Sequence, residues 1–277
     1  MTSSPAAPAT TGTLQVPGTA LHYELRGAGP LLVLVGAPMN AASFAPLADQ
    51  LAADHTVLTT DPRGINRSTV EDPEQDSTPE LRADDLSRLI AHVDAGPATV
   101  LGSSGGAISA LALVQAHPEQ VRTVVAHEPP LDELLDDREQ VRAQTDEIIA
   151  THVAGDLMGA WRKFLAVAGI ELPEPVFEQA FGNDRDPQKL ADEHFWFTRE
   201  LGPTVRWRPD LAALRAAPAR IVIGIGEDST GQSCDRTSRA LGAALGIDPT
   251  LFPGDHTGFV DDPEQFAARL RAVLGEG

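Results

Sequence analysis

The stretch that decides the fold is ATVLGSSGGAISALAL, residues 98–113. It opens with apolar and β-branched residues, as a buried strand does, and closes with the apolar pattern of a helix. Between them lies a turn of small residues, Gly102-Ser103-Ser104-Gly105-Gly106. Glycines two positions before and after Ser104 allow neighbouring backbone to pass without a Cβ clash. The pattern is typical of a nucleophile elbow, which presents a serine hydroxyl for attack on a carbonyl carbon.

Ser103 is the neighbouring candidate nucleophile. The residue two positions before it is Leu101, where the elbow needs a small residue, so Ser104 is favoured. A surface loop rich in glycine and serine would contain the same residue types. The apolar strand before the turn and the helix after it favour the elbow over that alternative.

Composition limits the classes of function. The chain has 277 residues, 42% of them hydrophobic, which is enough for one large α/β domain or a core domain with an insertion. The formal net charge of −19 argues against nucleic acid or an anionic membrane as partner, because both require basic patches. No apolar run reaches the ~18 residues of a membrane helix. Residues 1–12 lack the features of a signal peptide and are expected to form a disordered tail.

The chain contains one cysteine, Cys234, which cannot form an intrachain disulfide. This fits a reducing compartment, and we expect a cytoplasmic protein. No His, Cys, Asp or Glu cluster has the sequence spacing of a metal site, and the glycine-rich turn has neither a Walker lysine nor dinucleotide-binding spacing. We therefore expect no metal and no cofactor. The sequence leaves the oligomeric state open, a homodimer included.

Short apolar strands alternate with helices along most of the chain. This order predicts an α/β fold with a mostly parallel, doubly wound sheet. The expected strands are residues 14–16, 20–26, 31–35, 55–59, 98–101, 121–126, 221–225 and 250–252. The expected helices are residues 42–51, 79–93, 107–113, 236–245 and 263–274.

The alternation stops between residues 131 and 216, where no strand is convincing. This stretch is expected to be a helical lid, inserted after the strand at 121–126 between the two core segments 13–130 and 217–277. Such an insertion would lie over the C-terminal edge of the sheet, where open α/β sheets bind ligands. Most of its aromatic residues are expected to pack the insertion onto the core. Phe195 and Trp196, with Met39, are expected to line an apolar pocket.

A serine nucleophile requires a general base, and the base requires an orienting acid. Of eight histidines, only His256 lies in a glycine-flanked loop near the C-terminus, between the last strand and the last helix. His256 is therefore the candidate base.

At this point the chain resembles the α/β-hydrolases, from about residue 14 to residue 274. The resemblance rests on the elbow, on Gly254-Asp255-His256, on the glycine loop that follows residues 31–35 and on Asp61-Pro62-Arg63-Gly64. It implies the chain order serine, acid, histidine, and a lid where the insertion lies. It also implies an oxyanion hole formed by the backbone N–H groups of Gly105 and Ala37.

The resemblance leaves two candidates for the acid. Family members usually take it from the loop after the strand at 221–225, which favours Asp228, but the common family spacing places the acid at position 229, which is Ser229. Glu128, at the end of the strand at 121–126, is similarly placed to the acid of the zearalenone lactonases. We favour Glu128 and keep Asp228 as the alternative.

These residues predict a cofactor-independent serine hydrolase. Because the insertion is rich in aromatic residues, we expect its substrate to be an ester or lactone of a mostly apolar small molecule. Carbon–carbon bond hydrolysis, perhydrolysis and acyl transfer use the same three residues and remain open. A hypothesis of a different class is a non-catalytic protein that binds a small molecule on the same fold.

Overall fold

In the computed structural model, which describes residues 9–182 and 185–275, nine strands form one sheet. Strand order is β1-β2-β4-β3-β6-β7-β8-β9, with β5 paired to β2. The strands from β4 to β9 along this order run parallel, and β1 and β2 are antiparallel to their neighbours. The strands are β1 (Thr10–Val16), β2 (Thr19–Arg26), β3 (Leu31–Val35), β4 (Thr56–Thr60), β5 (Thr69–Val70), β6 (Ala98–Ser103), β7 (Val121–His127), β8 (Arg220–Gly226) and β9 (Thr250–Phe252).

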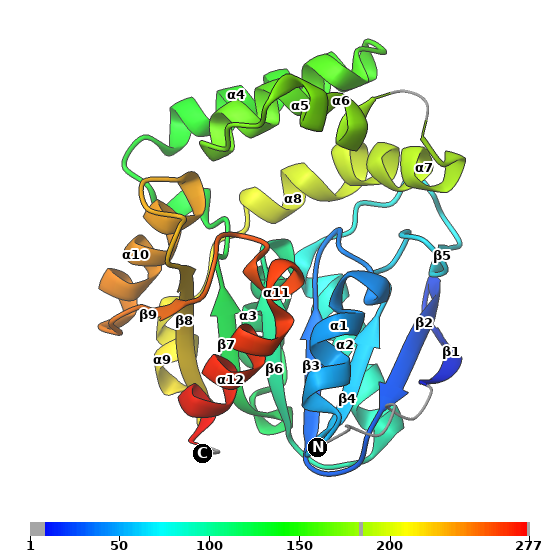
Figure 1. Ribbon diagram of the computed structural model, residues 1–277, viewed down its shortest axis with the longest axis vertical. Coiled ribbons are helices and arrows are strands. Elements are labelled where there is room, and N and C mark those ends of the chain that lie inside the picture. Colours follow the sequence, from blue (N-terminus) through cyan, green and yellow to red (C-terminus); the bar gives the residue numbers. More distant parts are fainter. Residues whose placement is uncertain (1–8, 183–184, 276–277) are drawn as a thin grey trace.

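Helices cover both faces of this sheet and one of its ends (Figure 1). The α-helices are α1 (Ala41–Leu51), α2 (Pro79–Val93), α3 (Gly105–Ala116), α4 (Arg138–Val153), α5 (Leu157–Ala168), α6 (Glu174–Phe181), α7 (Pro187–Phe195), α8 (Leu201–Val205), α9 (Leu211–Ala216), α10 (Ser233–Leu245), α11 (Gly258–Asp261) and α12 (Pro263–Leu274). Short 3₁₀ turns at Pro118–Gln120 and Asp132–Leu134 and a π-helical turn at Trp196–Glu200 complete the described elements.

The two faces of the sheet bury separate apolar clusters. On one face, side chains of β3 and β6 pack with α2, α3, α9 and α10. On the other, Phe44 of α1 packs with Phe259 of α11 and Phe266 of α12 against the alternate side chains of the same strands. The central strands β3 and β6 are fully buried along their length, as strands covered on both faces must be. The expected doubly wound fold is therefore observed.

The segment between β7 and β8 is helical throughout the residues that the structure describes, as expected. Figure 1 shows α4 to α8 stacked above one end of the sheet. These helices have an apolar cluster of their own, in which Trp161, Trp196 and Phe197 contact one another.

The structure corrects the expected boundaries at two places. Residues 10–12, expected to belong to a disordered tail, begin β1, while residues 1–8 of that tail lie outside the described residues. The last part of the expected insertion belongs to the core, because Trp207 and Leu214 of the segment ending in α9 join the apolar cluster of α2 and α3. No helix among the described residues is both long enough and apolar enough to cross a lipid bilayer.

The insertion is fastened to the core by buried polar contacts. The buried Arg82 of α2 donates to the Thr204 hydroxyl of α8 at 2.9 Å. Glu200, fully buried in the π-helical turn, lies 3.9 Å from the Arg82 guanidinium. An unpaired carboxylate at that depth would be costly, so Arg82 fixes where the π-helical turn and α8 rest on the core.

At the junction of β3, β6 and α3, we expect a single added methyl group to lower the stability of the protein strongly. A Cβ on Gly106 would lie 2.2 Å from the Val35 carbonyl oxygen and 2.7 Å from the Gly36 Cα. Because backbone cannot move aside cheaply, we expect Gly106→Ala to lower the free energy of unfolding by at least about 2 kcal/mol. The control is Gly202→Ala in α8, where a Cβ would make ordinary contacts with the Ile149 side chain at 3.6 Å and the Arg206 guanidinium at 3.9 Å. Urea unfolding should show the control unchanged or up to about 1 kcal/mol more stable; equal stabilities of the two variants would contradict the packing argument.

Candidate active site

Ser104 occupies the sharp turn between β6 and α3. Its φ is +56°, in the left-handed region that a side chain rarely adopts, at a typical cost of about 1–3 kcal/mol. Two backbone bonds hold this conformation: the Ser104 N–H donates to the His127 carbonyl at 2.9 Å, and the Ala107 N–H donates to the Ser104 carbonyl at 2.9 Å. Ser103 is fully buried, whereas Ser104 is partly exposed. Of the two serines, the geometry presents Ser104.

Glu128 occupies the corresponding turn at the end of the neighbouring strand. Ser103 and His127 are paired in the β6–β7 register, so Ser104 and Glu128 are the next residues of two adjacent strands. Glu128 also has a positive φ, +52°, and its backbone N–H donates to the Gly224 carbonyl of β8 at 3.0 Å. Two strained residues thus lie side by side at the C-terminal edge of the sheet, where such strain often accompanies function.

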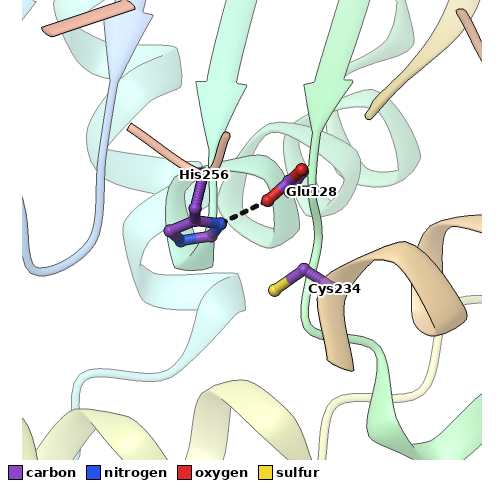
Figure 2. A group of neighbouring side chains, drawn as sticks. All are labelled: Glu128, Cys234 and His256. Atoms are coloured by element: carbon purple, nitrogen blue, oxygen red, sulfur yellow. Dashed lines mark hydrogen bonds and ion pairs between the residues drawn. The ribbon is translucent and has the colours of Figure 1, made fainter. Parts of the chain in front are cut away.

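The carboxylate of Glu128 is fully buried and has two hydrogen-bond donors. The Gly226 N–H donates to Oε1 at 2.8 Å, and Nδ1 of His256 donates to Oε2 at 2.6 Å (Figure 2). Burial alone would raise the pKa of Glu128, but the bond from His256 and the neighbouring imidazoles outweigh it and lower the pKa to about 2. Glu128 is therefore an anion at neutral pH.

His256 lies in the loop between β9 and α11, and about one fifth of its side chain is exposed. Burial disfavours the imidazolium, but Cys234 and Glu128 outweigh burial and raise the pKa of His256. The contribution of Cys234 requires its thiolate, whereas that of the Glu128 carboxylate persists at neutral pH. Because Nδ1 donates to the carboxylate, the neutral ring carries its lone pair on Nε2.

The neighbouring His127 differs from His256 in every respect that matters for proton transfer. It is fully buried among Phe252, Phe259 and Phe266, and its Nδ1 lies 3.2 Å from the Ser103 hydroxyl oxygen. Burial lowers its pKa to about 4, so it remains neutral at pH 7. His127 is a packing residue.

The other candidate acid, Asp228, is exposed on the loop after β8. Its backbone N–H donates to the Gly254 carbonyl at 3.0 Å, which ties this loop to the loop of His256. The next residue, Ser229, is fully buried and contributes to the low pKa of Glu128. The structure thus brings Glu128, and not Asp228, to the imidazole of His256.

The two expected oxyanion donors lie next to each other. A Cβ on Gly105 would lie 2.6 Å from the Ala37 carbonyl oxygen and 3.1 Å from the Ala37 Cβ, so only glycine allows this approach. The buried carboxylate of Asp61 supports the Ala37 loop, since it accepts the Ala41 N–H at 2.9 Å at the start of α1. The same carboxylate accepts Arg67 Nε at 2.8 Å and joins two loops.

The sequence alone did not reveal this role of Asp61. Arg63 of the same motif is buried and donates twice to Asp85, at 2.7 Å each, which holds the loop in place.

The residues expected to line an apolar pocket are engaged in packing. Trp196 is 6% exposed and stacks on Trp161 at 5.0 Å within the cluster of the insertion. The Phe195 ring covers Gly64, and Met39 packs against the apolar cluster of α1. The aromatic content of the insertion is therefore mostly explained by its own core, and the pocket-lining role of these residues stays a prediction.

Cys234, in the first turn of α10, is brought beside the Glu128–His256 pair (Figure 2). Its sulfur, a ring nitrogen of His256 and a carboxylate oxygen of Glu128 all lie within 4.8 Å of one another. No metal site was expected from the sequence, because only the spacing of ligand residues along the chain was considered. The three residues come from three distant segments, so no sequence pattern reveals the grouping.

Comparisons with known proteins agree with this architecture. A family model described as alpha/beta hydrolase fold matches residues 29–156. The chain is 32% identical over 269 residues to the uncharacterized hydrolase YraK of Bacillus subtilis (strain 168), covering 95% of each chain. It is 29% identical over 275 residues to a zearalenone hydrolase of Bionectria ochroleuca, covering 93% of this chain and 95% of the relative.

Among solved structures, an esterase from Exiguobacterium antarcticum superposes with a TM-score of 0.75 at 20% identity, covering 96% of this chain and all of that one. At that identity the likeness concerns the fold alone. The sheet order, the elbow at Ser104 and the full-length relationship to the Bacillus hydrolase lead to one conclusion: the chain belongs to the α/β-hydrolase family and is a hydrolase.

Proposed function

We propose that this hydrolase cleaves a carboxylic ester or lactone without a cofactor, through Ser104, His256 and Glu128. The observation that carries the proposal is the 2.6 Å bond between His256 Nδ1 and the buried Glu128 carboxylate, one strand away from the strained Ser104. A nucleophile, a base and an orienting anion in this order form the arrangement used for acyl transfer by serine enzymes.

The reaction begins at the Ser104 hydroxyl. Its oxygen attacks the carbonyl carbon of the substrate while its proton passes to Nε2 of His256. Glu128 holds the ring in the tautomer that can accept this proton and stabilises the imidazolium that forms. The negative charge of the tetrahedral intermediate falls on the former carbonyl oxygen, which the N–H groups of Gly105 and Ala37 stabilise.

The intermediate collapses by breaking the bond to the alcohol oxygen, which takes the proton from His256 Nε2. A water molecule then attacks the acyl carbon and gives its proton to His256, which returns it to the oxygen of Ser104. The carboxylic acid leaves and the free enzyme is restored. With a lactone, both products of the cleavage remain in one hydroxy acid.

The first prediction concerns the nucleophile. We expect Ser104→Ala to lower kcat for short p-nitrophenyl esters by about 10⁴-fold or more, because the neighbouring hydroxyl in the turn, that of Ser103, is fully buried. Ser103→Ala is the matched control and should keep most of the activity, since Ser103 is buried. A fluorophosphonate probe should label the wild type and the control but not Ser104→Ala. A wild type that neither labels nor turns over esters or lactones would favour the non-catalytic binding hypothesis.

The second prediction separates the two acids. We expect Glu128→Gln to lower kcat about 10³–10⁴-fold, because the amide cannot hold the productive tautomer or stabilise the imidazolium. Asp228→Asn should change kcat less than twofold, since Asp228 is exposed and does not contact His256. Steady-state kinetics on one ester decides between them; a larger loss in Asp228→Asn would overturn the assignment.

The third prediction concerns pH. The anionic Glu128 stabilises the imidazolium, so removing its charge should lower the pKa of His256. Because only the neutral ring accepts a proton, the acidic limb of kcat/KM should move to lower pH in Glu128→Gln. Proton NMR titration of the His256 ring in Ser104→Ala, with and without Glu128→Gln, checks the same shift without turnover. An unchanged pKa would contradict the coupling.

The fourth prediction concerns the substrate class. A relative 29% identical to this chain is named for zearalenone, which makes zearalenone a reasonable first substrate beside simple lactones and aryl esters. Acid release measured by pH-stat compares these classes on one scale. We expect the highest kcat/KM among apolar esters and lactones; preference for a charged substrate would contradict the proposed class.

A further inference from the structure

We propose that Cys234, His256 and Glu128 form a binding site for a soft divalent metal ion such as Zn²⁺, and that the bound ion switches the enzyme off. The three side chains offer one sulfur, one nitrogen and one oxygen ligand within 4.8 Å of one another. Figure 2 shows the sulfur of Cys234 directed toward the space beside the His256–Glu128 bond. The part of this inference that concerns inhibition rests on the proposed function, and the part that concerns binding does not.

The ligand types fit zinc. Zinc sites with three protein ligands and an open fourth position use these same donors, thiolate, imidazole and carboxylate. Ligand atoms on one tetrahedral zinc lie about 3.3–3.7 Å apart, given bond lengths of about 2.0–2.3 Å. The ligand atoms lie at most 4.8 Å apart, and His256 Nδ1 lies 2.6 Å from Glu128 Oε2, so each pair is within about 1 Å of the zinc spacing. Rotations of the partly exposed His256 and Cys234 side chains can cover this difference.

The electrostatic surroundings also favour a cation. The Glu128 carboxylate is fully buried, and one of its oxygens lies within 4.8 Å of the Cys234 sulfur. A divalent ion compensates this negative surrounding and displaces the thiol proton, which is released to solvent, as the thiolate becomes a ligand. The same ion is a partner for the Glu128 carboxylate while His256 turns from it.

Either nitrogen of His256 gives the same functional result. If the ion takes Nε2, the lone pair that accepts the proton of Ser104 is occupied. If the ion takes Nδ1, the neutral ring carries its proton on Nε2 and cannot accept another. In both cases the bound ion removes the general base, so inhibition follows from occupancy of the site.

The test uses untagged full-length protein, freed of metal with EDTA and then dialysed. We expect micromolar Zn²⁺ to abolish ester hydrolysis and excess EDTA to restore it, whereas Mg²⁺, which prefers oxygen ligands, has no effect. Cys234→Ser should retain at least half of the metal-free activity and require at least tenfold more Zn²⁺ for half-inhibition. Equal sensitivity of Cys234→Ser and wild type would overturn the proposal.

A second measurement does not depend on catalysis. Cd²⁺ bound by a thiolate gives a charge-transfer absorption in the ultraviolet, and Cys234 is the only cysteine in the chain. We expect this band, with one Cd²⁺ per chain by calorimetry, in wild type and in Ser104→Ala, its loss in Cys234→Ser and Cys234→Ala, and weaker binding in His256→Gln. If the protein hydrolyses no ester but the band appears, the metal site stands and the proposed function fails. If esters are cleaved and no band appears, the proposed function stands and the metal site fails.

The control addresses a pair of histidines on the insertion that could also bind zinc. His152 Nε2 lies 3.0 Å from His194 Nδ1 on the insertion, where zinc would bind without involving Cys234. We expect His194→Asn to leave the inhibition by Zn²⁺ unchanged. Loss of inhibition in this variant would assign the effect to the insertion and contradict the proposal.

Discussion

The buried charge of Glu128 is the constraint on which the site depends. A carboxylate removed from water is costly unless its oxygens are hydrogen bonded, and here one oxygen has the Gly226 N–H and the other has His256. The first bond ties the end of β7 to the end of β8, and the second fixes the loop after β9. The Glu128 side chain therefore holds together the ends of β7 and β8 and the loop after β9, which are distant in sequence. The orientation of the imidazole follows from these contacts.

Close backbone packing supplies the second constraint. The elbow brings α3 so near to β3 that Gly106 has no room for a side chain, and Gly105 lies against Ala37 for the same reason. The buried carboxylate of Asp61 then anchors the start of α1 and the loop that carries Arg67. These contacts are polar or steric rather than apolar. The apolar clusters on the two faces of the sheet stabilise the fold, and the short contacts at its edge determine the geometry of the site.

The local sequence pattern was sufficient to predict the elbow around Ser104 and the parallel core of the sheet. The strand–turn–helix around Ser104 and the parallel core depend on short-range periodicity and on glycine positions, which are visible in the chain itself. Packing partners are not visible in this way. Phe195 and Trp196 of the insertion were expected to line a pocket, a role that stays a prediction. The sequence did not reveal that Trp196 packs on Trp161 of α5, because this is a tertiary contact. Likewise, helix α9 carries no local sign that it belongs to the core, and the two-residue strand β5 is too short to have a pattern.

The position of Glu128, the proposed acid, illustrates how a spacing rule can fail although a buried carboxylate still contacts the imidazole. Adjacent parallel strands lie about 4.7–4.9 Å apart, so the ends of β7 and β8 both lie within reach of one imidazole. In this chain the position usual for the acid after β8 is Ser229, which is buried and helps to lower the pKa of the Glu128 carboxylate. Glutamate has one methylene more than aspartate, and from the end of β7 its carboxylate reaches the Gly226 N–H at the end of β8. The requirement is therefore for a buried anion at one point in space, and the fold allows either of two strands to supply it.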